Sequence, residues 1–167
     1  MLTWAVLIIL ILLSAFFSGA ETALTTVNKI KIRSLYESGD KRAKTLIRVH
    51  EKWDKMLSCI LVCNNIVNIA ASAIATTLAL KINLAVGIMT GVITIVVLIF
   101  GEITPKSIAT AYSEKISLAI APVILFLMCI LTPVIWIINV ISKVLLIIFR
   151  LDISRTDSAM TERELRT

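Results

Sequence analysis

Charged residues, histidine and cysteine are all scarce in this sequence. Only 17% of its 167 residues are charged, whereas 58% are hydrophobic. A soluble domain carries about a quarter charged residues, so a water-soluble globular fold is excluded. With one histidine and three cysteines, the chain also lacks the ligand set that a zinc or copper centre prefers.

The few cysteines and the single histidine are expected to be structural. Cys59, Cys63 and Cys129 lie inside apolar runs and belong to no metal or redox motif, so we interpret them as small packing residues. His50 lies in a basic segment and is expected to be solvated. No apolar run holds a histidine, and no nucleophile–base pair is evident, which argues against a membrane enzyme.

Long apolar runs make up most of the sequence. Four stretches contain no Asp, Glu, Lys or Arg: 2–20, 56–80, 82–101 and 116–142. Each of the first three has about the 20 residues that a helix needs to cross the hydrocarbon core. An odd set of such runs cannot close a barrel, so they are helices. The sequence predicts an all-α membrane protein with three spans, at about 2–23, 56–80 and 84–103.

Positive charge is concentrated between the first two spans. Nine of the 17 Lys and Arg residues fall between positions 28 and 55. The bias of cytoplasmic loops toward basic residues explains this net charge of +6 without nucleic acid. Apolar residues recur within 28–54, and Gly39 divides the segment, which predicts two short amphipathic helices on anionic lipid headgroups. We expect a multi-pass plasma-membrane protein with an uncleaved first span and the N-terminus outside.

The last apolar stretch is too long for one ordinary crossing. Pro122 and Pro133 interrupt it, and basic residues flank it at both ends, so an even number of crossings is required. We predict a juxtamembrane or interfacial helical hairpin over 114–150, formed by 114–131 and 133–150. Lys143 would extend to the inner headgroups. A fourth span that places the C-terminus outside is the alternative. The transmembrane domain would cover 1–150, and the polar residues 151–167 would form a linker.

Polar residues within the spans fall into three clusters: Ser14, Ser18 and Thr22; Asn64, Asn65 and Asn68; and Glu102. Residues four apart share a helical face, so the two serines form one stripe and Asn64 and Asn68 form another. Serines can also bond to their own helix, and asparagines can join neighbouring helices. Glu102 can instead pair with Lys106 at the interface.

Gly101 and Pro105 add a backbone carbonyl to the possible ligands around Glu102. Pro105 has no amide hydrogen, so it cannot bond the carbonyl of Gly101 four residues back. That carbonyl becomes a candidate ligand beside Glu102. Carboxylate, amide, hydroxyl and carbonyl oxygens together suit hard cations such as Mg²⁺, Ca²⁺ or Na⁺. A single carboxylate among neutral oxygens predicts a weak site that can release its ion.

Three motifs, in order and spacing, give the chain a family resemblance: Phe17–Ala23, Cys63–Asn68 and Gly101–Lys106. They resemble the transmembrane domain of the CorC/CNNM family of magnesium transporters. The resemblance implies a homodimer with three spans per subunit and Mg²⁺ export coupled to Na⁺ entry from an inward-facing cavity. It also implies that nucleotide binds only to a CBS-domain pair beyond 151–167. A non-transporting, Mg²⁺-sensing scaffold is the alternative.

The resemblance also implies a set of Mg²⁺ ligands: Ser14, Ser18, Asn64, Asn68, Gly101 and Glu102. Gly19 and Pro105 would shape the site, and Asn65 and Thr22 are possible additional ligands. The residues by themselves do not distinguish Mg²⁺ from Ca²⁺ or give the direction of transport.

Overall fold

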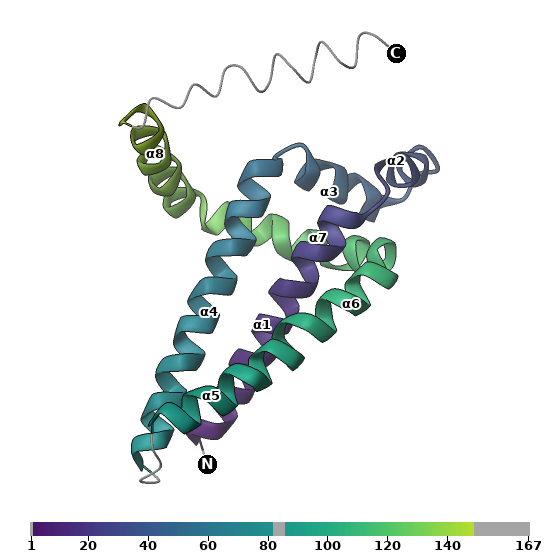
Figure 1. Cartoon of the computed structure of the whole chain (residues 1–167). Coiled ribbons are helices and arrows are strands. Elements are labelled where there is room, and N and C mark those ends of the chain that lie inside the picture. Colours follow the sequence, from purple (N-terminus) through teal and green to yellow (C-terminus); the bar gives the residue numbers. More distant parts are fainter. Residues whose placement is uncertain (1, 82–85, 149–167) are drawn as a thin grey trace. The chain divides into compact units, whose positions relative to one another are not determined.

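Every element that the structure describes is a helix. The computed structural model describes residues 2–81 and 86–148, and Figure 1 shows the helices along this part of the chain. The chain divides after Ile130 into two compact units. The first unit holds seven α-helices and one π-helix, and the second holds α8.

The predicted spans are confirmed as long helices. They are α1 (Leu2–Thr26), α4 (Trp53–Lys81) and a continuous rod made of α5 (Val86–Val96), the π-helix η1 (Val97–Ile103) and α6 (Thr104–Ala111). Length and apolar composition also make α7 (Ser113–Ile130) a candidate span. Among the described residues, four helices therefore qualify as spans, one more than the three predicted. The membrane class follows from these helices.

The basic segment folds as two short helices, as predicted. Asn28 caps α2 (Lys29–Glu37) by accepting two backbone N–H bonds, and Asp40 caps α3 (Lys41–His50) by accepting one. Between them Gly39 adopts φ 93°, a left-handed conformation that suits glycine at the end of a helix. The caps and this glycine set the two helix boundaries.

Helix α1 is the centre of the first unit. It packs against α4 on one side and against η1 and α6 on the other (Figure 1), and it also contacts α7. One buried apolar cluster joins α1, α4 and α5: Leu7, Ala71, Ala75, Leu78, Ala79, Met89 and Ile93. The alanines let α4 approach its neighbours closely. Large apolar side chains on the outer face of α5, such as Ile88 and Val92, are exposed, as lipid-facing residues are.

The expectation that His50 is solvated is wrong. Both ring nitrogens are buried and have no hydrogen-bond partner among the described residues. The ring packs against Trp53 with centroids 5.4 Å apart, and Lys29 lies 5.0 Å over the same indole. Burial, together with the nearby charge of Lys29, lowers the pKa of His50 below its ordinary value. The end of α3 is therefore packed rather than frayed into water.

The long C-terminal apolar stretch forms two helices, close to the predicted bounds. Helix α7 ends at Ile130, and α8 covers Thr132–Ile148 with Pro133 in its first turn, where a missing N–H is tolerated. Pro122 lies inside α7 and does not interrupt it, contrary to expectation. The Lys143 side chain and the predicted linker 151–167 lie outside the described parts of the chain, and the hairpin arrangement stays a prediction.

Candidate cation site

Three of the predicted ligands meet where α1, α4 and η1 converge. The Ser14 hydroxyl donates a hydrogen bond of 2.8 Å to Oδ1 of Asn68, which joins α1 to α4. Ser14 is 1% exposed. A Cβ atom at Gly101 would lie 3.1 Å from Ser14 Oγ, so η1 approaches this serine at the one place where a side chain is absent. Hydroxyl, amide and backbone groups from three segments thus share one location.

Glu102 reaches the same location through a cavity. Asn68 and Glu102 both line a cavity of about 170 Å³ between α4 and the α5–η1 rod. The carboxylate is partly buried. In the described part of the chain no basic side chain pairs with Glu102, because Lys106 lies 3.6 Å from Glu21 instead. The carboxylate is therefore available to a cation.

Ser18 is buried and Asn64 is half-buried, and each has a buried side-chain oxygen without a hydrogen-bond partner. Ser18 is 0% exposed, and its hydroxyl has no hydrogen-bond partner; Oδ1 of Asn64 is also buried and unpaired. A buried polar atom without a partner costs about 1–3 kcal/mol, and a bound water or ion is a common reason for tolerating one. In the described residues, the other unpaired buried side-chain polar atoms are the two nitrogens of His50. These oxygens fit a hard cation.

Gly19 and Pro105, predicted to shape the site, are neighbours. A Cβ atom at Gly19 would lie 3.6 Å from the Pro105 carbonyl oxygen and 3.7 Å from its Cβ. Pro105 is the second residue after η1, and the amide of the intervening Thr104 donates to the carbonyl of Ile99, five residues back. Such wide turns occur often at functional sites. This turn contains both Gly101 and Glu102.

The two possible additional ligands, Thr22 and Asn65, make no hydrogen bond to Ser14 or Asn68 among the described residues. The Thr22 hydroxyl donates to the backbone carbonyl of Ser18 at 3.2 Å, the local bond common for threonine in helices. Asn65 is exposed on α4. The structure brings together Ser14, Asn68 and Gly101, with Glu102 on the adjoining cavity.

Sequence reasoning missed three hydroxyl residues that line this cavity: Ser72, Thr90 and Thr94. Ser72 follows Asn68 by four residues, so a helical-face rule would have found it. The described residues contain no cluster of three His, Cys, Asp or Glu side chains that would suit a metal ion. The donors around the cavity are neutral oxygens and the Glu102 carboxylate.

The fold and its buried polar residues define an α-helical membrane protein. The chain belongs to the family described as the Cyclin M transmembrane N-terminal domain, whose model matches residues 5–167. It is 41% identical over 164 residues to a UPF0053 protein of Haemophilus influenzae, covering 97% of this chain and 39% of that protein. It is 36% identical over 161 residues to the UPF0053 inner membrane protein YfjD of Escherichia coli, covering 93% and 37%.

A further relative is named for a substrate. The chain is 36% identical over 172 residues to a protein of Escherichia coli named polyamine export protein, covering 94% of this chain and 38% of that protein. The chain thus spans about two fifths of the length of the curated relatives it matches.

Proposed function

We propose that this domain transports Mg²⁺ across the membrane, exporting it in exchange for Na⁺. The observation that carries the proposal is the convergence of Ser14, Asn68 and Gly101 beside the cavity that Glu102 lines. Membership of the family and the export function in a relative's name support membrane transport as the class. Assembly as a homodimer in the plasma membrane, with the basic helices α2 and α3 on anionic headgroups, belongs to the same proposal.

The chemistry of the donors supports a hard cation. Mg²⁺ releases its water reluctantly, so a site must offer several oxygens at once. Ser14, Ser18, Asn64 and Asn68 supply neutral oxygens, and Glu102 supplies negative charge. Because this charge is single, the site would bind an ion weakly enough to release it during transport. Na⁺ would compete for the same oxygens and favour release.

A second candidate cargo is an organic polycation. The support is a relative named for polyamine export, together with the mixed walls of the Glu102 cavity. Ile93, Val97 and Leu98 line it beside the polar residues, and such apolar walls suit the methylene chain of a polyamine. Mg²⁺ would gain no binding energy from these apolar walls, whereas the methylene groups of a polyamine would pack against them.

The test is Glu102→Gln, which removes the charge and keeps the shape. We expect Mg²⁺ flux in proteoliposomes to vanish and Mg²⁺ affinity to fall at least about tenfold, equivalent to about 1.4 kcal/mol. Glu37→Gln is the matched control, because Glu37 lies on α2 and its carboxylate faces Arg33 of the same helix at 3.7 Å. Flux through the control should equal that of the native chain.

Each other outcome has a defined meaning. Native flux in Glu102→Gln would remove the carboxylate from the site and overturn the proposal. Binding of Mg²⁺ without flux in the native chain would identify the non-transporting sensor. Flux of spermidine without flux of Mg²⁺, lost in Glu102→Gln, would establish the organic cargo.

A further inference from the structure

Hydroxyl groups continue the polar lining of the Glu102 cavity away from the ligand cluster. Ser72 lies one turn of α4 beyond Asn68, and Thr90 and Thr94 lie one turn apart on α5. All three line the same cavity of about 170 Å³ as Asn68 and Glu102. Two different helices therefore direct hydroxyl-bearing residues toward one space.

These residues all lie on one side of the carboxylate. Helix α4 runs from Trp53 to Lys81, so Ser72 lies between Asn68 and the Lys81 end. Helix α5 begins at Val86, so Thr90 and Thr94 lie between that end and Glu102. The two ends are neighbours in sequence and lie at the same end of the helix pair (Figure 1). The basic helices α2 and α3 precede the opposite end of α4.

A local hydrogen bond within the helix can explain a threonine in a membrane span, but it uses only the hydrogen of the hydroxyl group. Thr94 donates its hydroxyl hydrogen to the carbonyl of Thr90 at 2.8 Å, as threonines in membrane helices commonly do. That bond uses the donor and leaves the oxygen lone pairs as acceptors. The Thr94 oxygen can therefore accept a contact from a cation in the cavity while its hydrogen is engaged in the helix.

The remaining wall of the cavity is apolar. It is formed by Ala75, Ile93, Val97 and Leu98. Between Glu102 and Thr90 the hydroxyl oxygens are the polar groups of the cavity lining, so an ion that moves in this direction would contact them in turn. Neutral oxygens hold a divalent cation less strongly than a carboxylate does, so moving from Glu102 to the threonines weakens binding stepwise.

We propose that Ser72, Thr94 and Thr90 form the outward leg of the transport path, along which the cation leaves Glu102. This inference rests on the proposed function. It adds three positions that conduct the ion after it has bound and that contribute little to the initial binding from the cytoplasm. Loss of a hydroxyl should therefore slow transport and leave equilibrium affinity nearly unchanged.

The decisive variant is Thr94→Val, which replaces the hydroxyl by a methyl group of similar size. Mg²⁺ flux in proteoliposomes should fall at least about tenfold, while Mg²⁺ affinity measured by calorimetry should change less than about twofold. Thr94→Ser restores the oxygen and should restore the flux. Thr77→Val is the control, because this exposed α4 threonine bonds the Ala73 carbonyl at 3.0 Å and does not line the Glu102 cavity.

A chemical probe tests the direction. Thr94→Cys is made in a background in which Cys59, Cys63 and Cys129 are alanine. We expect a charged methanethiosulfonate reagent added outside to block flux, and the same reagent added inside to block it much more slowly. Equal block from both sides, or block from the inside alone, would overturn the outward assignment.

The outcomes separate this inference from the proposed function. If Thr94→Val transports like the native chain while Glu102→Gln does not, the outward leg is wrong and the transport function stands. If Thr94→Val loses affinity as strongly as Glu102→Gln, Thr94 is a ligand and the outward leg is also wrong. If Glu102→Gln keeps its flux, the proposed function itself fails.

Discussion

Gly101 is the residue on which the geometry of the site depends most directly. The nearest atom to a Cβ built there is Ser14 Oγ at 3.1 Å, closer than ordinary contact, whereas Gly91 on the same rod has nothing within 4 Å. An alanine at Gly101 would therefore push a predicted ligand that is fixed by its bond to Asn68. Because Gly101 has no side chain, Ser14 can keep its position and its bond to Asn68.

Gly101→Ala should weaken cation binding without destabilising the helix. We expect Mg²⁺ affinity to fall severalfold as Ser14 moves by a few tenths of an ångström, because close-packed side chains transmit such shifts. Helix propensity favours alanine over glycine by about 1 kcal/mol, so thermal stability should not fall for that reason. Calorimetry measures the affinity. Gly91→Ala, in open space, should bind like the native chain, and equal affinities in the two variants would contradict this account.

For individual residues, the sequence predicted the contact face of some site residues but not the hydrogen-bond partners of all of them. The four-residue spacing placed Ser14 and Asn68 correctly on facing sides of their helices, because rotation per residue in an α-helix is fixed. The same rule extended the serine stripe to Thr22, whose hydroxyl donates to the Ser18 carbonyl and keeps its lone pairs as acceptors. Spacing cannot decide between a local and a tertiary hydrogen bond, because that depends on which neighbour is present.

The element with the clearest response to pH is α3. His50, its last residue, is half-buried with its ring against Trp53 and near Lys29, and both features favour the neutral ring. The sequence placed α2 and α3 correctly from their caps and from Gly39. It did not predict the burial of His50, because nothing local indicates that Trp53 packs on the imidazole.

Acidification should destabilise this part of the molecule. Because the folded pKa of His50 lies below the ordinary value of 6.5, the unfolded chain binds the proton more readily. Stability is therefore complete above pH 6.5 and falls as the pH drops below it toward the folded pKa. The thermal unfolding temperature in detergent should decrease between about pH 7 and 5, and less so in His50→Gln. An equal decrease in both proteins would assign the effect to other groups.

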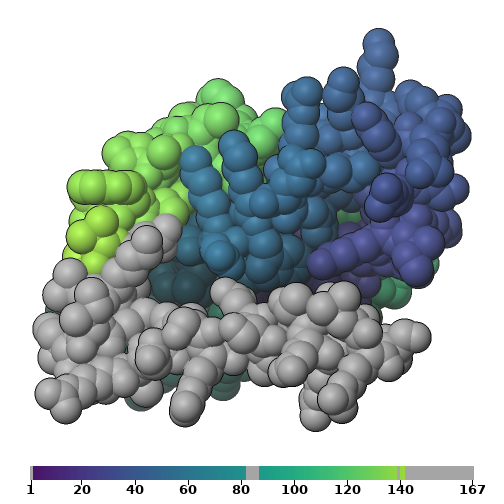
Figure 2. Space-filling model, turned by 90° about the horizontal axis from the view of Figure 1, so that it is seen from above, coloured from purple at the N-terminus to yellow at the C-terminus, as the bar shows by residue number. Residues whose placement is uncertain are grey.

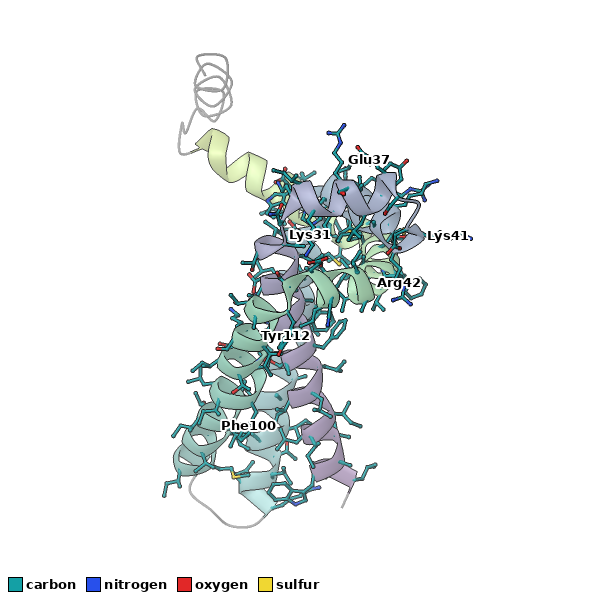
Figure 3. The ribbon with its side chains drawn as sticks, turned by 90° about the vertical axis from the view of Figure 1, so that its right-hand side faces the viewer. Lys31, Glu37, Lys41, Arg42, Phe100 and Tyr112 are labelled. Carbon is teal, nitrogen blue, oxygen red and sulfur yellow. The ribbon has the colours of Figure 1, made fainter. Side chains whose placement is uncertain are left out.

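For the whole molecule, the distribution of charge fixes the orientation that we expect. Figure 3 shows Lys31, Lys41 and Arg42 together at the end that carries α2 and α3, away from Phe100. Figure 2, seen from above, shows the α2–α3 segment in purple-blue at the upper right. An ion pair of 2.6 Å between Lys31 and Glu114 attaches α2 to the start of α7. Basic residues gathered at one end favour the cytoplasmic side for that end.

A reporter fused after residue 167 tests this topology. If the first span enters from outside and 114–150 makes zero or two crossings, the C-terminus is cytoplasmic. Green fluorescent protein should then fluoresce at that position, and alkaline phosphatase should be inactive. If α7 is a true fourth span and α8 does not cross, green fluorescent protein should be dark at that position and alkaline phosphatase should be active. The basic residues at both ends of 114–150 favour the first case, but α7 has the length and composition of a span, which is why the sequence left a fourth span as the alternative.

The π-helix has a consequence for the angle at which Glu102 projects. Eight residues separate Thr94 from Glu102, and a regular α-helix of 3.6 residues per turn would rotate them about 80° apart. Both nevertheless line one cavity. Each residue in a π-turn advances through a smaller angle, so Val97–Ile103 absorbs part of that rotation and aligns the carboxylate with the hydroxyls. Removing one residue from 97–101 would restore regular helical bonds, and the seven remaining steps of about 100° would still leave the carboxylate within about 20° of Thr94.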